Sequence, residues 1–73
     1  MPIYYGAILV VVGASFSVPK STRLYRDSEG HGPGKTLGEL GEDGYIHVTK
    51  VREGARCPVH VAGKYGDLGW IMI

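Results

Sequence analysis

Glycine and proline recur so often along this chain that helices are disfavoured over most of its length. The 73 residues include 12 glycines and four prolines, and both residue types destabilise helix interiors. Between the glycine-rich turns lie short runs that contain valine, isoleucine and tyrosine, which favour extended structure. The spacing of turns and runs therefore predicts a chain made of short strands.

The expected strands cover residues 3–12, 22–26, 36–40, 45–51, 56–62 and 68–73. Turns rich in glycine and charged residues separate most of them. Several short strands at such spacing, with no helical period between them, predict an all-β fold. We expect a small barrel of about five to six short antiparallel strands with little or no helix. A chain of this length forms one domain, which here covers residues 1–73.

The first expected strand is the longest and the most apolar. Residues 7–12 are all apolar and include three consecutive valines, which favour a strand. The apolar run is too short to span a bilayer as a helix, and no Lys or Arg precedes it as in a signal peptide. A strand is therefore preferred, with a targeting segment as the alternative.

A strand that is apolar on both faces needs cover for the face that the barrel core does not bury. This pattern predicts self-association through the N-terminal strand, because large exposed apolar surfaces mark association sites. The alternative is that residues 13–21 fold back over the second face.

Residues 30–36 read Gly-His-Gly-Pro-Gly-Lys-Thr, which resembles a phosphate-binding loop. Such a loop requires four residues between its first glycine and the Gly-Lys-Thr. Gly30 leaves three, and Glu29 occupies the position where glycine is required. No helix is expected to follow. The sequence therefore predicts a flexible surface loop, and a weak anion site of backbone N–H groups beside Lys35 is left open.

Residues 45–62 are expected to form a hairpin. A two-residue turn at Glu53 and Gly54 places His47 directly opposite His60 on the outer face. Val51 falls out of phase with this register, which indicates a bulge or splaying near the turn. The residues expected to face the core are Ile46, Val48, Val59 and Val61.

Three segments occur in the order typical of bacterial SH3-like (SH3b) domains. They are LYRDSEG at residues 24–30, TLGELGEDGYIHV at residues 36–48 and GKYGDLGWI at residues 63–71. The chain resembles this family over residues 22–71. The resemblance implies an SH3-like barrel that binds cell-wall peptide, other peptides or protein partners, and that is rarely an enzyme. The long apolar first strand and Pro58 within a hairpin strand depart from the family pattern.

The resemblance also implies that Ile71 enters the barrel while Trp70 lies at its surface. A half-exposed tryptophan beside tyrosines offers a large rigid contact area to a peptide. The equally weighted alternative is that Trp70 caps the core. The candidate ligand-binding residues are Trp70, Tyr25, Tyr65, Tyr45, His47 and His60.

No catalytic residue, metal ligand or cofactor is expected. Cys57 and His60 lie three positions apart on an expected strand and therefore point to opposite faces, so Cys57 is interpreted as a small apolar residue. His47 and His60 alone are too few ligands for a structural zinc ion, which would need a third group. The acidic side chains lie mainly in turns and are expected to serve solubility.

Charge and cysteine content narrow the expected partners and location. Eight basic and seven acidic residues give a formal charge of +1, so nucleic-acid binding and membrane association are not expected. A small basic patch of Lys50, Arg52, Arg56 and Lys64 is diluted by Glu53 and Asp67. The single cysteine favours a reducing, cytoplasmic location over a secreted or cell-wall-associated one.

The sequence thus predicts a non-enzymatic interaction module that binds a peptide or protein partner through an aromatic surface. The alternative function is that of a small oligomeric barrel with a ligand-binding or catalytic groove between its subunits.

Overall fold

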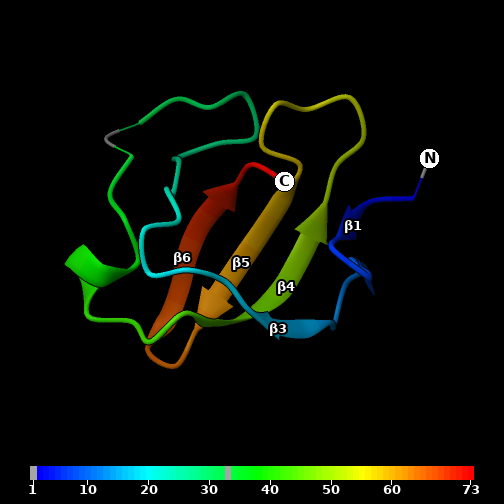
Figure 1. Ribbon diagram of the computed structural model, residues 1–73. Coiled ribbons are helices and arrows are strands. Elements are labelled where there is room, and N and C mark those ends of the chain that lie inside the picture. The colour runs from blue at the N-terminus through cyan, green and yellow to red at the C-terminus, as the bar shows by residue number, and fades with distance from the viewer. Residues whose placement is uncertain (1, 33) are drawn as a thin grey trace.

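The computed structural model describes residues 2–32 and 34–73. The chain forms two antiparallel sheets (Figure 1). A two-stranded sheet contains β1 (Tyr4–Tyr5) and β2 (Ile8–Leu9), and a four-stranded sheet contains, in spatial order, β3 (Ser15–Ser17), β4 (Tyr45–Val51), β5 (Val59–Gly63) and β6 (Gly66–Ile71). The helical element within the described residues is one 3₁₀ turn, η1 (Gly38–Leu40). The predicted all-β class is confirmed, although the four-stranded sheet does not close into a barrel.

One backbone pairing continues the four-stranded sheet beyond β6. Tyr25 and Trp70 exchange two N–H to carbonyl hydrogen bonds of 2.8 and 2.9 Å. Gly69 permits this close approach, because a Cβ there would lie 2.8 Å from the carbonyl oxygen of Tyr25. Of the strand predicted over residues 22–26, only isolated pairings of Arg23 and Tyr25 are present. Tyr25 and β3, which are near neighbours in sequence, therefore flank opposite edges of the sheet.

The hydrophobic core lies on the inner face of the four-stranded sheet. Alternation in β4 builds it, because Ile46 and Val48 are buried while Tyr45 and His47 are exposed. All four hairpin residues predicted to face the core do so. The buried cluster consists of Val10, Phe16, Val18, Leu24, Leu37, Ile46, Val48, Val59, Val61 and Ile71.

The predicted register of β4 against β5 is wrong. Val48 faces Val61 and His47 faces Ala62, so His47 and His60 are not the directly paired neighbours that we expected. The shift is two residues at Val48 and three residues at Val51, which faces Val59. The even shift keeps the side chains that precede Thr49 on their original faces, and the extra residue Thr49 accounts for the odd shift that follows. The predicted core face is therefore correct although the predicted partners are not.

The loop between β4 and β5 is longer than the predicted two-residue turn. The backbone N–H of Arg52 donates to the carbonyl of Pro58 over 2.7 Å, which leaves residues 53–57 as the loop. The bulge expected near the turn is present, because the register shifts between Val48 and Lys50. Thr49 is the extra residue, and two residues of β4 consequently oppose one residue of β5.

The predicted continuous strand over residues 3–12 is wrong. Gly6 has a φ of +59°, which glycine adopts without steric cost, and residues 6–7 turn the chain back so that β1 pairs with β2. Val10 then enters the core, whereas Val11 and Val12 are exposed.

The segment predicted as a strand over residues 36–40 forms η1 instead. The backbone N–H of Thr36 donates to the Glu39 carboxylate over 2.6 Å, and the Glu39 N–H donates to the Thr36 hydroxyl over 3.3 Å. This reciprocal pair is a capping box, for which Thr-x-x-Glu is the sequence signal. The hydrogen bond from the Thr36 backbone, followed by the one from its side chain, lowers the pKa of Glu39 below its usual value.

Candidate functional site

Tyr25, His60 and Trp70 lie in one row across the outer face of the four-stranded sheet. His60 pairs with Trp70, and Trp70 pairs with Tyr25. The ring centroids of His60 and Trp70 are 5.0 Å apart in a T-shaped arrangement. Lys50 extends the row onto β4, because it pairs with His60. The structure thus brings together three of the six predicted ligand-binding residues, which we call the aromatic row.

Trp70 is covered rather than half-exposed. Only 9% of its surface is exposed, so its indole offers little area to a partner. Tyr25 and His60, on either side of it, are partly exposed. The accessible part of the aromatic row therefore consists of these two flanking side chains.

The other three predicted ligand-binding residues lie away from the aromatic row. Tyr45 and His47 contact each other on β4, with ring centroids 5.4 Å apart, and Nδ1 of His47 lies 2.6 Å from the Ser15 hydroxyl. Tyr65 lies in the turn between β5 and β6 and is 79% exposed, with Lys64 Nζ 5.7 Å from its ring centroid. These three side chains therefore take no part in the cross-strand pairs that form the aromatic row.

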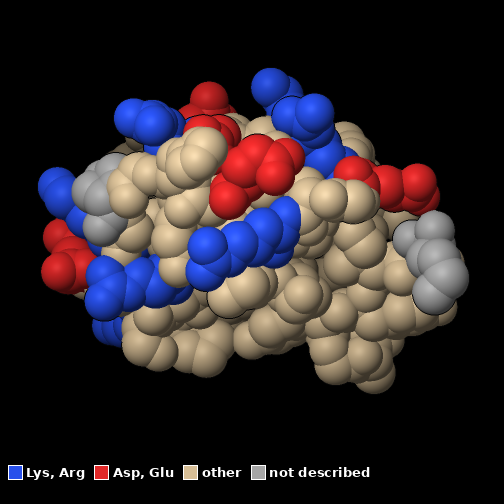
Figure 2. All heavy atoms as spheres, turned by 90° about the horizontal axis from the view of Figure 1, so that it is seen from above, with Lys and Arg blue, Asp and Glu red and all other residues tan. Residues whose placement is uncertain are grey.

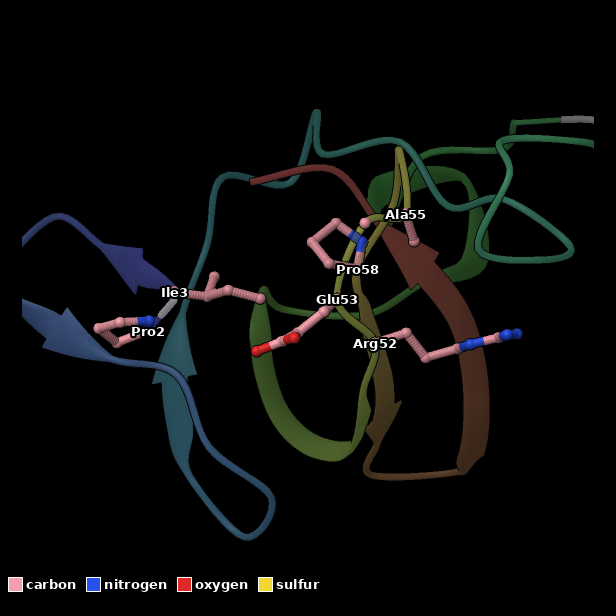
Figure 3. Close-up of a pocket in the computed structure, with 7 residues that line it drawn as sticks. Pro2, Ile3, Arg52, Glu53, Ala55 and Pro58 are labelled. Atoms are coloured by element: carbon pink, nitrogen blue, oxygen red, sulfur yellow. The ribbon is translucent and has the colours of Figure 1, made fainter.

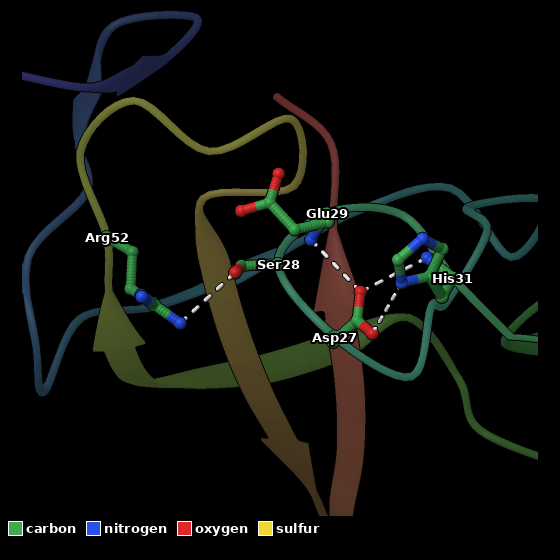
Figure 4. A network of polar contacts seen from close by, with 5 residues as sticks. All are labelled: Asp27, Ser28, Glu29, His31 and Arg52. Carbon is green, nitrogen blue, oxygen red and sulfur yellow. Dashed lines mark hydrogen bonds and ion pairs between the residues drawn. The ribbon is translucent and has the colours of Figure 1, made fainter.

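Two loops meet beside the aromatic row, and Ser28 joins them. Its carbonyl accepts a 2.8 Å hydrogen bond from the Cys57 N–H, and its buried hydroxyl accepts a 3.3 Å hydrogen bond from the Arg52 guanidinium (Figure 4). The Arg56 guanidinium lies 6.0 Å from the ring centroid of Tyr25, within cation–π range. Two arginines of the predicted basic patch are therefore held against the protein's own groups.

Asp27 stabilises the tip of the first loop. Its carboxylate accepts hydrogen bonds from the backbone N–H groups of Glu29 (3.0 Å) and His31 (3.2 Å), and lies 2.9 Å from Nδ1 of His31. Partial desolvation raises the pKa of Asp27, but the hydrogen bonds from His31 and Glu29 outweigh it and lower the pKa below its usual value. Ser28 points toward Arg52 and away from this pair (Figure 4). Within the described part of this loop, Ser28 therefore contacts Arg52 while His31 contacts Asp27.

Two chemically reactive side chains are buried. Cys57 is 0% exposed, and desolvation raises the pKa of its thiol despite the opposing charge of Arg56. Since the thiolate is the nucleophile, Cys57 fits its interpretation as an apolar residue. Glu42 does not serve solubility as expected, because it is only 4% exposed. Its carboxylate packs against Gly63, where an added Cβ would lie 2.6 Å from Oε1.

The N-terminal hairpin presents a group of exposed apolar side chains. Between 41% and 65% of the surface of each is exposed, and residues 1–19 contain no Lys, Arg, His, Asp or Glu. Figure 2 shows charged side chains intermixed over one part of the molecule, and a broad area along the lower edge of the view that carries none. We call the exposed apolar side chains of the N-terminal segment the N-terminal apolar surface. It consists of Tyr4, Ile8, Leu9, Val11 and Val12.

A pocket of about 370 Å³ lies between the N-terminal segment and the loop that follows β4. Its apolar wall includes Pro2, Ile3 and Pro58. Arg52 and Glu53 flank it but point in opposite directions, with Glu53 toward the N-terminal segment and Arg52 away from it (Figure 3). Glu53 therefore dilutes the charge of Arg52 less than their adjacency in sequence suggests.

Comparison of the chain with protein-family models, with curated proteins and with solved structures finds no match. The resemblance to SH3b domains therefore stays a prediction. In residues 2–32 and 34–73, no helix is long and apolar enough to cross a membrane, and no three His, Cys, Asp or Glu side chains are grouped to hold a metal ion.

Proposed function

We propose that this protein is a non-enzymatic interaction module whose first partner is a second copy of the same chain. The observation that carries the proposal is the N-terminal apolar surface. Contiguous exposed apolar groups are uncommon on monomeric soluble proteins and mark association sites. Here several exposed apolar side chains are concentrated within residues 4–12, and residues 1–19 contain no charged residue.

The fold supports an intermolecular partner over cover from within the chain. The alternative was that residues 13–21 fold back over the apolar strand. Those residues instead contain β3, which pairs with β4 at the edge of the four-stranded sheet. Val11 and Val12 remain 49% and 65% exposed, which supports cover from another molecule over cover from residues 13–21.

A second copy suits this surface because an uncharged apolar patch is complementary to itself. Two-fold symmetry would bring the same residues of both copies together. Tyr4 and Leu9 are paired and share one face of the hairpin, whereas Ile8 lies on the other face with Tyr5. An interface that covers Tyr4, Leu9, Val11 and Val12 buries the exposed halves of four apolar side chains, which contributes roughly 4 kcal/mol per copy. That gain is comparable with the cost of association, so we expect weak dimers that form with increasing concentration.

Peptide binding beside the aromatic row is the second part of the proposal. Tyr25 and His60 keep partial exposure there, and Tyr25 is anchored at the backbone by its pairing with Trp70. A rigidly held tyrosine can contact a partner at low entropic cost.

Sedimentation velocity tests self-association over a concentration range that reaches about 500 µM, since weak association is expected. We expect the average mass of the wild type to rise with concentration. The double variant Leu9→Lys with Val12→Lys should stay monomeric and folded by circular dichroism. Tyr65→Lys is the control, because it places one of the two added charges at an exposed aromatic residue elsewhere, and it should associate like the wild type. A wild type that remains monomeric throughout contradicts the proposal.

A further inference from the structure

A second, smaller pocket lies between η1, β6 and the segment around Tyr25, which pairs with β6. Residues 23–26 run antiparallel to residues 31–32 and 34–36, with the Leu24 N–H donating to the Lys35 carbonyl over 2.8 Å. This pair of segments and η1 lie beside β6 (Figure 1). The pocket has a volume of about 170 Å³, and we call it the hairpin pocket. It is lined by Leu24, Tyr25, Arg26, Lys35, Leu40 and Leu68.

The hairpin pocket combines an apolar floor with a cationic rim. Leu24 is buried in the core and Leu68 packs against it, whereas Leu40 is 42% exposed. Arg26 and Lys35 are exposed, and none of the described residues that line the pocket is acidic. The side chains are therefore suited to a ligand that carries an apolar group and a negative charge close together.

The two cations at the rim are available to such a ligand. Within the described residues, neither Arg26 nor Lys35 forms an ion pair. Glu39 is close enough for Lys35 to contribute a minor lowering of its pKa. However, the Glu39 carboxylate is engaged by the backbone N–H of Thr36 in the capping box, which restrains it from swinging onto Lys35.

The volume limits the occupant to a small group. Pockets for drug-sized ligands and cofactors span roughly 300–1,000 Å³, so about 170 Å³ holds little more than one residue. The C-terminal residue of a polypeptide carries its carboxylate and its side chain on the same Cα. An apolar residue at that position can place its side chain on the leucines while its carboxylate reaches Arg26 and Lys35.

We propose that the hairpin pocket binds the C-terminal residue of a partner protein, with an apolar side chain on Leu24, Leu40 and Leu68 and the terminal carboxylate at Arg26 and Lys35. This inference rests on the proposed function as an interaction module and names the chemistry of the peptide partner. Recognition of a terminal carboxylate is an established mode of peptide binding, and charge-assisted hydrogen bonds to arginine give it strength and direction.

Nuclear magnetic resonance titration of the ¹⁵N-labelled protein tests the proposal with three synthetic peptides of the same length. One ends in leucine with a free carboxylate, one ends in the leucine amide, and one ends in serine with a free carboxylate. We expect the first to shift the amide signals of Leu24, Arg26 and Leu68. Loss of the charge or of the apolar side chain should each weaken binding by about tenfold or more.

Variants locate the binding at the rim cations. Arg26→Gln combined with Lys35→Gln should weaken binding of the peptide that ends in leucine with a free carboxylate by about tenfold or more. Lys20→Gln combined with Lys64→Gln removes the same charge from exposed positions outside the pocket, and it should leave the affinity within about twofold once salt screening is matched. All four side chains are exposed, so both variants are expected to fold.

Three results would overturn the inference. The first is equal binding of the peptide that ends in leucine with a free carboxylate and of the peptide that ends in the leucine amide. The second is the absence of a signal shift with about 5 mM of the free-carboxylate peptide. The third is hexanoate binding as tightly as that peptide, which would assign the pocket to small acids. Repeating the titration with Leu9→Lys, Val12→Lys separates the two proposals. Because this variant is expected to stay monomeric, any peptide binding that it shows is independent of self-association. Either proposal can therefore be contradicted while the other is retained.

Discussion

The β4–β5 hairpin and the N-terminal hairpin are both rich in valine and isoleucine, yet they place these residues differently. In the β4–β5 hairpin, apolar residues alternate with polar ones, and Ile46, Val59 and Val61 are 0% exposed. In the N-terminal hairpin the apolar residues are consecutive, and Val10 is buried while its two neighbouring valines are exposed.

The difference shows that spacing, more than apolar content, decides where a strand residue lies. A strand presents successive side chains to opposite faces, so an alternating sequence buries its apolar half completely. A continuous apolar run must expose part of itself in a small single-layered core. We therefore expect substitutions in the first region to act on stability, and those in the second to act on association.

Two glycines with positive φ give the largest expected contrast. At Gly44 (φ +96°) an added Cβ would lie 2.4 Å from the Val18 carbonyl oxygen, while at Gly6 (φ +59°) nothing lies within 4 Å. Gly44→Ala should destabilise the fold by roughly 3 kcal/mol through strain and collision, and Gly6→Ala by only about 1 kcal/mol. Urea denaturation followed by circular dichroism measures both, and equal losses would contradict the contrast between the regions.

A matched pair of valines gives a contrast of intermediate size. Val59→Ala removes two buried methyl groups and leaves a cavity, so it should cost about 2–3 kcal/mol. Val12→Ala, at 65% exposure, should change the free energy of unfolding by less than about 0.5 kcal/mol. The comparison is made at low protein concentration to exclude self-association. A large loss at Val12 would mean that its side chain, like that of Val10, packs into the folded core.

Acidification gives the smallest expected effect, and it should act only outside the N-terminal segment. Asp27 and Glu39 both have a pKa below the usual value in the folded state. Their contribution to stability is therefore present above the unfolded pKa of about 4 and is lost as the pH falls through the lower folded pKa.

Urea midpoints between pH 7 and pH 3 measure this effect. Asp27→Asn and Glu39→Gln should each lose less stability on acidification than the wild type does. Residues 2–19 carry no group that titrates in this range, so self-association through the N-terminal apolar surface should stay nearly constant with pH while the protein remains folded. A variant with the same pH profile as the wild type would show that its carboxylate is not engaged.

Local sequence patterns were sufficient for the parts of the fold that repeat regularly. Alternation over residues 45–51 predicted β4 with the correct bounds, and it assigned the core face of the hairpin. It did not determine the partners across the strands, because Thr49 adds a residue and the loop is longer than two residues. β3 was missed, since only the buried Phe16 distinguishes three residues of strand from a loop.

The candidate site was harder to predict because it depends on contacts between distant segments. The order of the sequence motifs placed Tyr25 and Trp70 in the same predicted binding surface, and their backbones do pair. The burial of Trp70 and the position of Tyr65 depend on how loops and turns lie in three dimensions. The hairpin pocket has no local signal, because its lining comes from three separate parts of the chain.

The pairing between Tyr25 and Trp70 also has a kinetic consequence. The meander of β4, β5 and β6 joins segments that are close in sequence, and such hairpins form within microseconds. The pairing of Tyr25 with β6 must close a much longer loop, and the chain loses the entropy of loop closure before the stabilising contacts form. We therefore expect this edge to assemble last. Since Trp70 is the only tryptophan, its fluorescence in a stopped-flow experiment would report the slowest step of folding.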